Sequence, residues 1–356
     1  MLVRSVPADA DPGTLGRMDT WTIIGESASV TGGNGPDPVL QLSELAAVTG
    51  WTQKPEGWCR GDECIPASFI GDAATATALT ADQVASALGA TVAIDQPHRV
   101  AVIGTRPDAS RTLASGNAPD VQLLGLDGDR HGLFDGAEGK TLVVAFSSWC
   151  GCRYDLPGWK ALKDELADED FDVVAVAIDE STEDVAPWAA DIDFPVLVDT
   201  DRTFADTYGL TNVPTILWVD EERHIVRQPS IEFSDDQFTS IHGVESGPHL
   251  GAVRRWVLDG ELPAVDDRPT SDTGSLSEDQ RQARTEFRLA LELHRRGFAD
   301  AAAARVALAD RLAPDDFTIW RAGMQLVGDD PFGAEFFDRY TEWQQRHGGP
   351  LQVSET

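Results

Sequence analysis

Between residues 118 and 262 the sequence alternates short apolar runs with amphipathic segments, and this pattern constrains the fold most strongly. The runs TLVVAF, FDVVAVAID, FPVLVD and PTILWVD are short and almost wholly apolar, as buried β-strands are. Between the first two, DLPGWKALKDEL repeats apolar residues at helical spacing from Leu156 to Leu166. Strands that alternate with helices predict an α/β domain in which helices cover both faces of a central sheet.

Other segments flank this domain, which we place at residues 117–262. Residues 1–36 are rich in turn-forming residues and are expected to be flexible, whereas residues 37–105 predict a small α+β module. A polar linker at 263–276 leads into a helical module at 277–356. Its three predicted helices resemble one and a half tetratricopeptide units, which need another surface to cover their apolar face.

Acidic residues dominate the charge of the chain. Asp and Glu number 60 against 28 Lys and Arg, for a formal net charge of −32. Phosphate contacts need a basic surface, so we expect neither nucleic acid nor an anionic membrane as a partner. The acidic residues are spread along the chain, which fits a self-repelling soluble surface or adaptation to a salty cytosol that screens the repulsion.

The sequence has no apolar run near the ~20 residues of a membrane helix and no secretory signal, so we expect a cytoplasmic protein.

The four cysteines fall into two close pairs, which suggests redox or metal chemistry. In SSWCGCRYDLP, Cys150 and Cys152 are separated only by Gly151 and lie where a buried strand gives way to a helix. Free backbone N–H groups and the helix dipole there favour an anion, which lowers the pKa of a thiol. Arg153 adds positive charge, and Trp149 would shield the pair. Two alternatives stay open: a C-x-C fragment of a soft-metal site, and two small residues in a domain that has lost activity.

These motifs give residues 117–262 a resemblance to a known family. The segment NAPD, then a strand, then WCGCRYDLP and, roughly 60 residues later, YGLTNVPTILWVD, is similar to the pattern of TlpA- and ResA-type proteins among the AhpC/TSA redoxins. The resemblance implies a thioredoxin-like fold, with a central mixed sheet and helices on both faces. It also implies a thiol–disulfide oxidoreductase that needs no bound cofactor, only an external dithiol or disulfide, carried by a protein or a small thiol.

The resemblance assigns roles to individual residues. Cys150 would be the attacking thiolate and Cys152 the resolving thiol. Trp149 would frame the substrate site, together with Val213 and Pro214, because Pro214 falls where the family has a cis-proline. A cis bond there would turn an exposed backbone edge toward the sulfurs, and a substrate strand could pair with it.

The spacing of the cysteine pair departs from the family pattern, W-C-x-x-C, by one missing residue. A disulfide across Cys-Gly-Cys closes a small ring, and Gly151 relieves only part of the strain that we expect there. Strained disulfides are more oxidising, so we predict an oxidant or isomerase with a potential above the roughly −270 mV of thioredoxin.

The proton-handling residue and the peroxidase motif are also in question. Val144 stands where thioredoxins carry a buried acid, which leaves Asp155 and Asp179 as candidates, each expected to be a surface or capping residue. The peroxidase motif P-x-x-x-T-x-x-C fits poorly: Ser147 could supply the hydroxyl, but Val143 stands where the proline belongs. Peroxidase-like antioxidant activity therefore remains an alternative.

The second pair, Cys59 and Cys64, flanks a Gly61-Asp62 turn that predicts a hairpin. Three interpretations stay open: a structural or labile disulfide, two unconnected half-buried cysteines, or a second redox pair that exchanges electrons or shares a metal with Cys150 and Cys152. We predict no metal site, since no histidine has ligand spacing to a cysteine.

Two further questions concern the rest of the chain. The stretch SIEFSDDQFTSIHGVESG interrupts the α/β pattern before its last helix, either as a lid beside the active cleft or as a simple insertion. The rival to an enzyme is a non-catalytic scaffold, in which the C-terminal helices bind a protein partner.

Overall fold

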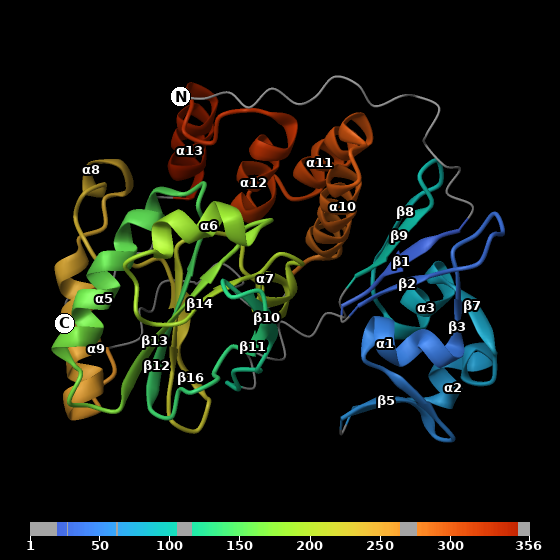
Figure 1. Ribbon diagram of the computed structural model, residues 1–356, viewed down its shortest axis with the longest axis horizontal. Helices are drawn as coiled ribbons and strands as arrows, with labels where there is room; N and C mark the ends of the chain where they lie inside the picture. The colour runs from blue at the N-terminus through green and yellow to red at the C-terminus, as the bar shows by residue number, and fades with distance from the viewer. Residues whose placement is uncertain (1–19, 27, 62, 105–115, 264–275, 348–356) are drawn as a thin grey trace. The chain divides into compact units, whose positions relative to one another are not determined.

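The structure is a computed structural model that forms two compact units, divided after Ile103 (Figure 1). It describes residues 20–26, 28–61, 63–104, 116–263 and 276–347.

The N-terminal unit is an α+β unit around a small apolar core. Trp21, Trp51 and Trp58 are almost fully buried in that core. One sheet has the strand order β2-β1-β9-β8, and a second has the order β4-β5-β6. The elements are β1 (Thr22–Ile24), β2 (Ser29–Thr31), β3 (Val39–Gln41), η1 (Leu42–Glu44), α1 (Leu45–Thr49), β4 (Thr52–Lys54), β5 (Gly57–Arg60), β6 (Glu63–Pro66), α2 (Ala67–Ile70), η2 (Gly71–Ala74), β7 (Ala78–Thr80), α3 (Ala81–Leu88), β8 (Val92–Asp95) and β9 (Val100–Ile103).

Strands β1 and β2 correct the expectation of a flexible segment at 1–36. They lie inside that segment and belong to the sheet, with β1 parallel to β9. The physical reason is the short run WTII, in which Trp21 and Ile23 are fully buried. The run lies among many glycines and prolines, so the composition of the segment did not predict a strand there. Residues 1–19 lie outside the described residues.

A seven-stranded mixed sheet forms the centre of the second unit, in the order β11-β10-β14-β13-β12-β15-β16. Its central strands β12 and β13 are parallel, and β15 runs antiparallel to β12. Nearly every residue of β12 and β13 is buried, as their continuous apolar runs predict for strands covered on both faces. The elements are β10 (Gln122–Gly125), β11 (Arg130–Gly132), β12 (Lys140–Phe146), η3 (Gly151–Asp155), α5 (Leu156–Glu165), β13 (Phe171–Ala177), α6 (Thr182–Ala189), β14 (Val196–Val198), α7 (Thr203–Thr207), β15 (Thr215–Val219), β16 (Ile225–Ser230), α8 (Thr239–His242) and α9 (Ser246–Asp259).

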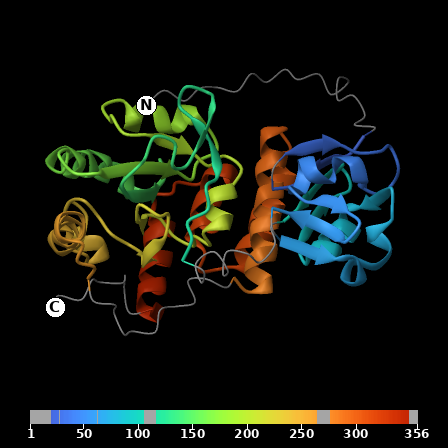
Figure 2. The same cartoon turned by 90° about the horizontal axis from the view of Figure 1, so that it is seen from below.

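Helices α5 and α9 lie side by side against the sheet (Figures 1 and 2). Arg254 of α9 forms a two-pronged ion pair with Glu165 of α5, with nitrogen–oxygen distances of 2.8 and 2.7 Å. The rings of Trp256 on α9 and Trp218 on β15 lie 5.0 Å apart, which packs α9 onto the sheet. The mixed sheet predicted for residues 117–262 is confirmed.

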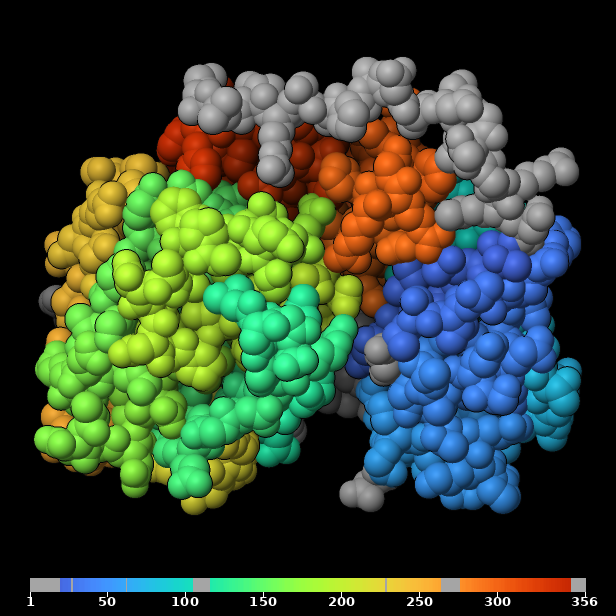
Figure 3. All heavy atoms as spheres, in the orientation of Figure 1, coloured from blue at the N-terminus to red at the C-terminus, as the bar shows by residue number. Residues whose placement is uncertain are grey.

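Four helices follow, and they pack against the sheet domain (Figures 2 and 3). On α10, Arg284 donates to the carbonyls of Ala205 and Leu210, and its guanidinium also contacts Asp206 and Asp316 at 3.2 Å each. The last helix was not anticipated from the sequence, and most of the predicted linker at 263–276 lies outside the described residues. The helices are α10 (Glu278–Arg295), α11 (Ala299–Leu312), α12 (Phe317–Val327) and α13 (Ala334–His347).

Within the part of the chain that the structure describes, no helix has both the length and the apolar character needed to cross a membrane.

Candidate functional site

The end of strand β12 delivers the cysteine pair to a helix start, as the sequence predicts. Cys150 is the N-cap of η3, and its sulfur accepts a hydrogen bond from the backbone N–H of Cys152 at 3.3 Å. On the other side, the Cys150 sulfur lies 3.6 Å from the carbonyl oxygen of Val213. The Val213–Pro214 bond is cis, as predicted. The structure therefore brings the cysteine pair and the proline loop together, although they lie about 60 residues apart in sequence.

The two thiols, which are both free and buried, differ sharply in acidity. Burial by itself raises the pKa of Cys150. Hydrogen bonds from the thiol and the N–H of Cys152 lower this pKa, and so do the positive charges of Arg321 and Arg153. These effects outweigh the effect of burial, and the pKa of Cys150 is about 6. Burial, the hydrogen bond to Cys150 and the negative charge of Cys150 raise the pKa of Cys152 well above its ordinary value. Near neutral pH, Cys150 is thus the thiolate and Cys152 the protonated thiol, an asymmetry that suits one attacking and one resolving sulfur.

Trp149 and Arg153 stand on either side of the cysteine pair in the sequence. Trp149 is buried, with 2% of its surface exposed. Arg153 lies over the ring of Trp188 at 4.1 Å and donates a hydrogen bond to the carbonyl of Ser148. A cation on an aromatic face keeps its charge while it is partly shielded from water. Its charge is one of the influences that lower the pKa of Cys150, as expected.

The stretch from Ser230 to Gly247, predicted as lid or insertion, borders the site. A Cβ atom added to Gly151 would come within 3.4 Å of the Phe238 ring, so this ring packs on the residue between the two cysteines. Phe238 also lies 5.9 Å from the ring of Tyr154. The stretch thus forms a wall of the site, which the sequence pattern had left open.

Each candidate acid was expected to be a surface or capping residue, and both prove to be buried. Asp155 does stand at the N-cap position of α5, although its side chain makes no capping hydrogen bond there. Burial raises the pKa of Asp155 to about 7, against hydrogen bonds from the backbone of Ser234 and Asp235. Asp155 also raises the pKa of Cys152 through its charge. Burial likewise raises the pKa of Asp179, which accepts hydrogen bonds from the backbone N–H of Ser148 at 3.0 Å.

One residue beside Cys150 was missed from the sequence. Arg321 of α12 is buried, and its charge lowers the pKa of Cys150. The sequence signal was an arginine within the largely apolar FTIWRAGMQLV, and nothing in the sequence connected it with a cysteine some 170 residues earlier.

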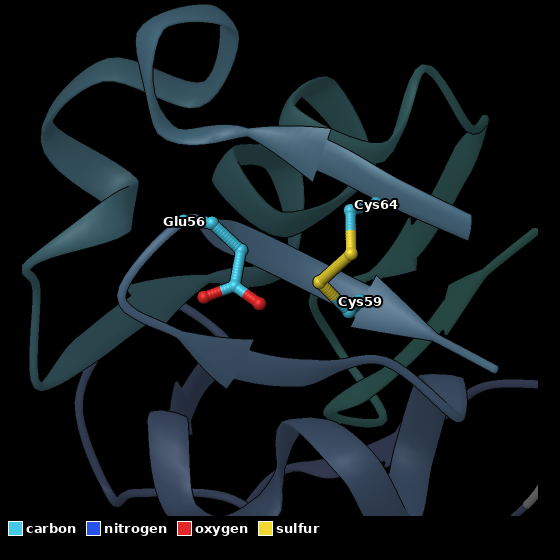
Figure 4. A group of neighbouring side chains, drawn as sticks. All are labelled: Glu56, Cys59 and Cys64. Atoms are coloured by element: carbon cyan, nitrogen blue, oxygen red, sulfur yellow. A yellow bond between two sulfur atoms is a disulfide. The ribbon is translucent and has the colours of Figure 1, made fainter. Parts of the chain in front are cut away.

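The second pair forms a disulfide in the N-terminal unit (Figure 4). Cys59 and Cys64 are paired across the β5–β6 hairpin, which confirms the disulfide interpretation over that of unconnected cysteines. The side chain of Glu56 lies beside them, with ligand atoms of all three residues within 4.8 Å of one another. Because the sulfurs are bonded to each other, this group offers no free thiolate to a metal. Electron exchange with Cys150 and Cys152 stays a prediction.

Comparison with known proteins agrees with this geometry. Residues 113–240 match the family model Redoxin. The thioredoxin-like protein YneN of Bacillus subtilis is 34% identical over 111 residues, which are 30% of this chain and 64% of that protein. The thiol-disulfide oxidoreductase ResA of Bacillus subtilis is 29% identical over 115 residues, 31% of this chain and 64% of that protein. The chain thus spans just under two thirds of the length of these two curated relatives.

Among solved structures, the exposed lipoprotein thioredoxin of Streptococcus pneumoniae is 30% identical. It matches 32% of this chain and 90% of that one, with a TM-score of 0.28. The family match, the mixed sheet and the cysteine pair beside a cis-proline agree with one another. Residues 113–240 are thus similar to redoxins, and residues 116–240 contain the mixed sheet of a thioredoxin-like fold.

Proposed function

We propose that this protein is a thiol–disulfide oxidoreductase that works through Cys150 and Cys152. The observation that carries the proposal is the asymmetry of the pair: Cys150 has a pKa of about 6, whereas the pKa of Cys152 is raised. The substrates would be disulfides or thiols of proteins or small molecules, and the site would need no bound cofactor.

The exchange has two steps. The Cys150 thiolate attacks a substrate disulfide, forms a mixed disulfide and releases one substrate thiolate, which takes a proton from water. Cys152 then loses its proton and attacks the Cys150 sulfur, which releases the second substrate thiol and leaves a Cys150–Cys152 disulfide. In this direction the substrate gains two electrons, and an external dithiol restores the pair. In the reverse direction, a substrate dithiol attacks the Cys150–Cys152 disulfide, leaves as a disulfide after giving up two electrons, and an external disulfide restores the oxidised pair, which is the direction of an oxidant. Asp155 is the candidate to receive the Cys152 proton, because its carboxyl titrates near neutrality and acts on that thiol.

The proposal also includes the direction of the reaction and the location of the protein. The small Cys-Gly-Cys ring favours an oxidant or isomerase, and we keep the cytoplasm as the proposed location. A second proposal is that the C-terminal helices form tetratricopeptide-like units and bind a protein partner. A peroxidase is less well supported, because the buried hydroxyl of Ser147 donates to Asp179 at 2.9 Å and is not free for a peroxide.

The test is exchange with insulin or glutathione disulfide, run beside peroxide consumption. Wild type should exchange, Cys150→Ser should lose essentially all exchange, and Cys152→Ser should accumulate a mixed disulfide on Cys150, because the resolving thiol is absent. Equal exchange by wild type and Cys150→Ser would rule out the proposal. Loss of peroxide consumption in Cys150→Ser without measurable exchange in wild type would favour the peroxidase instead.

A further inference from the structure

Arg321 lies in the middle of α12, within the C-terminal helical module. Only 7% of its surface is exposed. Its Nε donates to the carbonyl of Pro331 at 3.2 Å, and the guanidinium lies 3.6 Å from the centre of the Phe336 ring. On its other side lies Trp149, the residue before Cys150, with its ring centre 5.9 Å away. The side chain is thus held between its own module and the cysteine site.

No carboxylate among the described residues forms an ion pair with Arg321, although a buried cation ordinarily needs an anion beside it. The groups whose charges act on its pKa are Cys150, Cys152 and Tyr340, with Cys150 the largest of them. Arg153, from the turn of Cys150 itself, is a second cation whose charge lowers the pKa of Cys150. The Cys150 thiolate is therefore the anion that this buried guanidinium faces.

The position of α12 is fixed by contacts with the loop that leads to the cis-proline. The backbone N–H of Phe317, the first residue of α12, donates to the carbonyl of Thr211 at 2.8 Å. One residue earlier, Asp316 contacts Arg284, which itself bonds the carbonyls of Ala205 and Leu210. These bonds attach the helix to the same loop that presents Val213 to Cys150. The module therefore has a defined placement beside the site.

We propose that Arg321 stabilises the Cys150 thiolate, so that the C-terminal helical module completes the active site of the redoxin domain. The inference rests on the proposed function, in that Cys150 must work as a thiolate. An opposite charge close to a thiol favours its ionised form, and the effect is large where both groups are shielded from water. The module thus contributes to the chemistry, whether or not it also binds a partner.

The experiment measures the pH at which Cys150 becomes reactive. Reduced protein is treated with iodoacetamide across a pH series, and alkylation of residue 150 is followed by peptide mass mapping. In wild type we expect a midpoint near 6. In Arg321→Met we expect the midpoint to rise by about one to two pH units, because one nearby positive charge is lost. Arg321→Lys should restore most of the shift, since it keeps the charge.

The control is Arg346→Gln, which removes a charge from the surface of the same module. Arg346 is 52% exposed and pairs with Asp315, so its loss should leave the midpoint unchanged. Circular dichroism and thermal melting confirm that each variant is folded, and Arg321→Gln, which keeps a donor for Pro331, replaces Arg321→Met if that variant does not fold. A midpoint in the neutral variant equal to that of wild type would overturn the role of Arg321.

The two proposals fail in different ways, because alkylation needs no substrate. If wild type and Cys150→Ser exchange disulfides equally, the proposed function fails whatever the midpoint does. If exchange depends on Cys150 but the midpoint does not move without Arg321, only the role of Arg321 fails.

Discussion

Replacing Asp155 with Asn should change how the stability of the protein depends on pH. The carboxyl is 4% exposed and its pKa in the folded protein is about 7, against an ordinary value of 3.8. The difference is roughly three pH units at about 1.4 kcal/mol each, so the buried charge costs about 4 kcal/mol of stability at high pH. Because the folded pKa is raised, the contribution of Asp155 to stability is fully present below pH 3.8 and is lost as the pH rises through 7.

Between pH 5 and pH 8 the ionisation of Asp155 should lower the stability of wild type by about 3 kcal/mol, whereas Asp155→Asn lacks this loss. The amide oxygen of Asn can still accept the hydrogen bond that Asp155 receives from the backbone N–H of Ser234 at 2.7 Å. The assay is urea unfolding of both reduced proteins at several pH values, followed by tryptophan fluorescence. Other titrating groups are common to both proteins, so the difference between them reports Asp155. A difference that stays constant from pH 5 to pH 8 would refute the reasoning.

Two further predictions concern the wall of the site and the second cysteine pair. Phe238→Ala should raise the rate at which iodoacetamide alkylates Cys150 at high pH several-fold, because it opens the approach over Gly151, while the midpoint stays in place; an unchanged plateau rate would show that Phe238 does not limit access. Replacing Cys59 and Cys64 together with Ser should lower the stability of the N-terminal unit in urea by about 2 kcal/mol, the value expected for opening a loop of this length. Unchanged stability would contradict that role, and altered disulfide exchange would favour the relay interpretation.

The elements that sequence predicts well here are those whose signal is local. The apolar runs around Leu142 and Val173 become the central strands, because a strand covered on both faces has no polar side to show. The capping box of Ser277 and Gln280 begins α10 as the motif predicts, since its hydrogen bonds join residues only three apart. The Cys59–Cys64 hairpin is equally local, because its turn lies between the two cysteines.

The signals that sequence misses depend on distant contacts. Asp155 follows the cysteines in a turn, where a capping role is the ordinary expectation. It is buried only because the backbone of Ser234 and Asp235, about 80 residues later, lies over it. The run WTII at Trp21 is too short to stand out until β9 pairs with it.

Local sequence patterns were enough to predict the central mixed sheet, the cysteine pair after a strand, and the proline beside it, because these follow from apolar periodicity and from motifs within single elements. Which charges act on Cys150 depends on contacts between distant segments of the chain. Arg321 acts on the Cys150 sulfur because α12 packs against the loop before Pro214. The effect of a charge depends on its distance in space and on how far it is shielded from water. The spacing of residues along the sequence gives neither of these quantities.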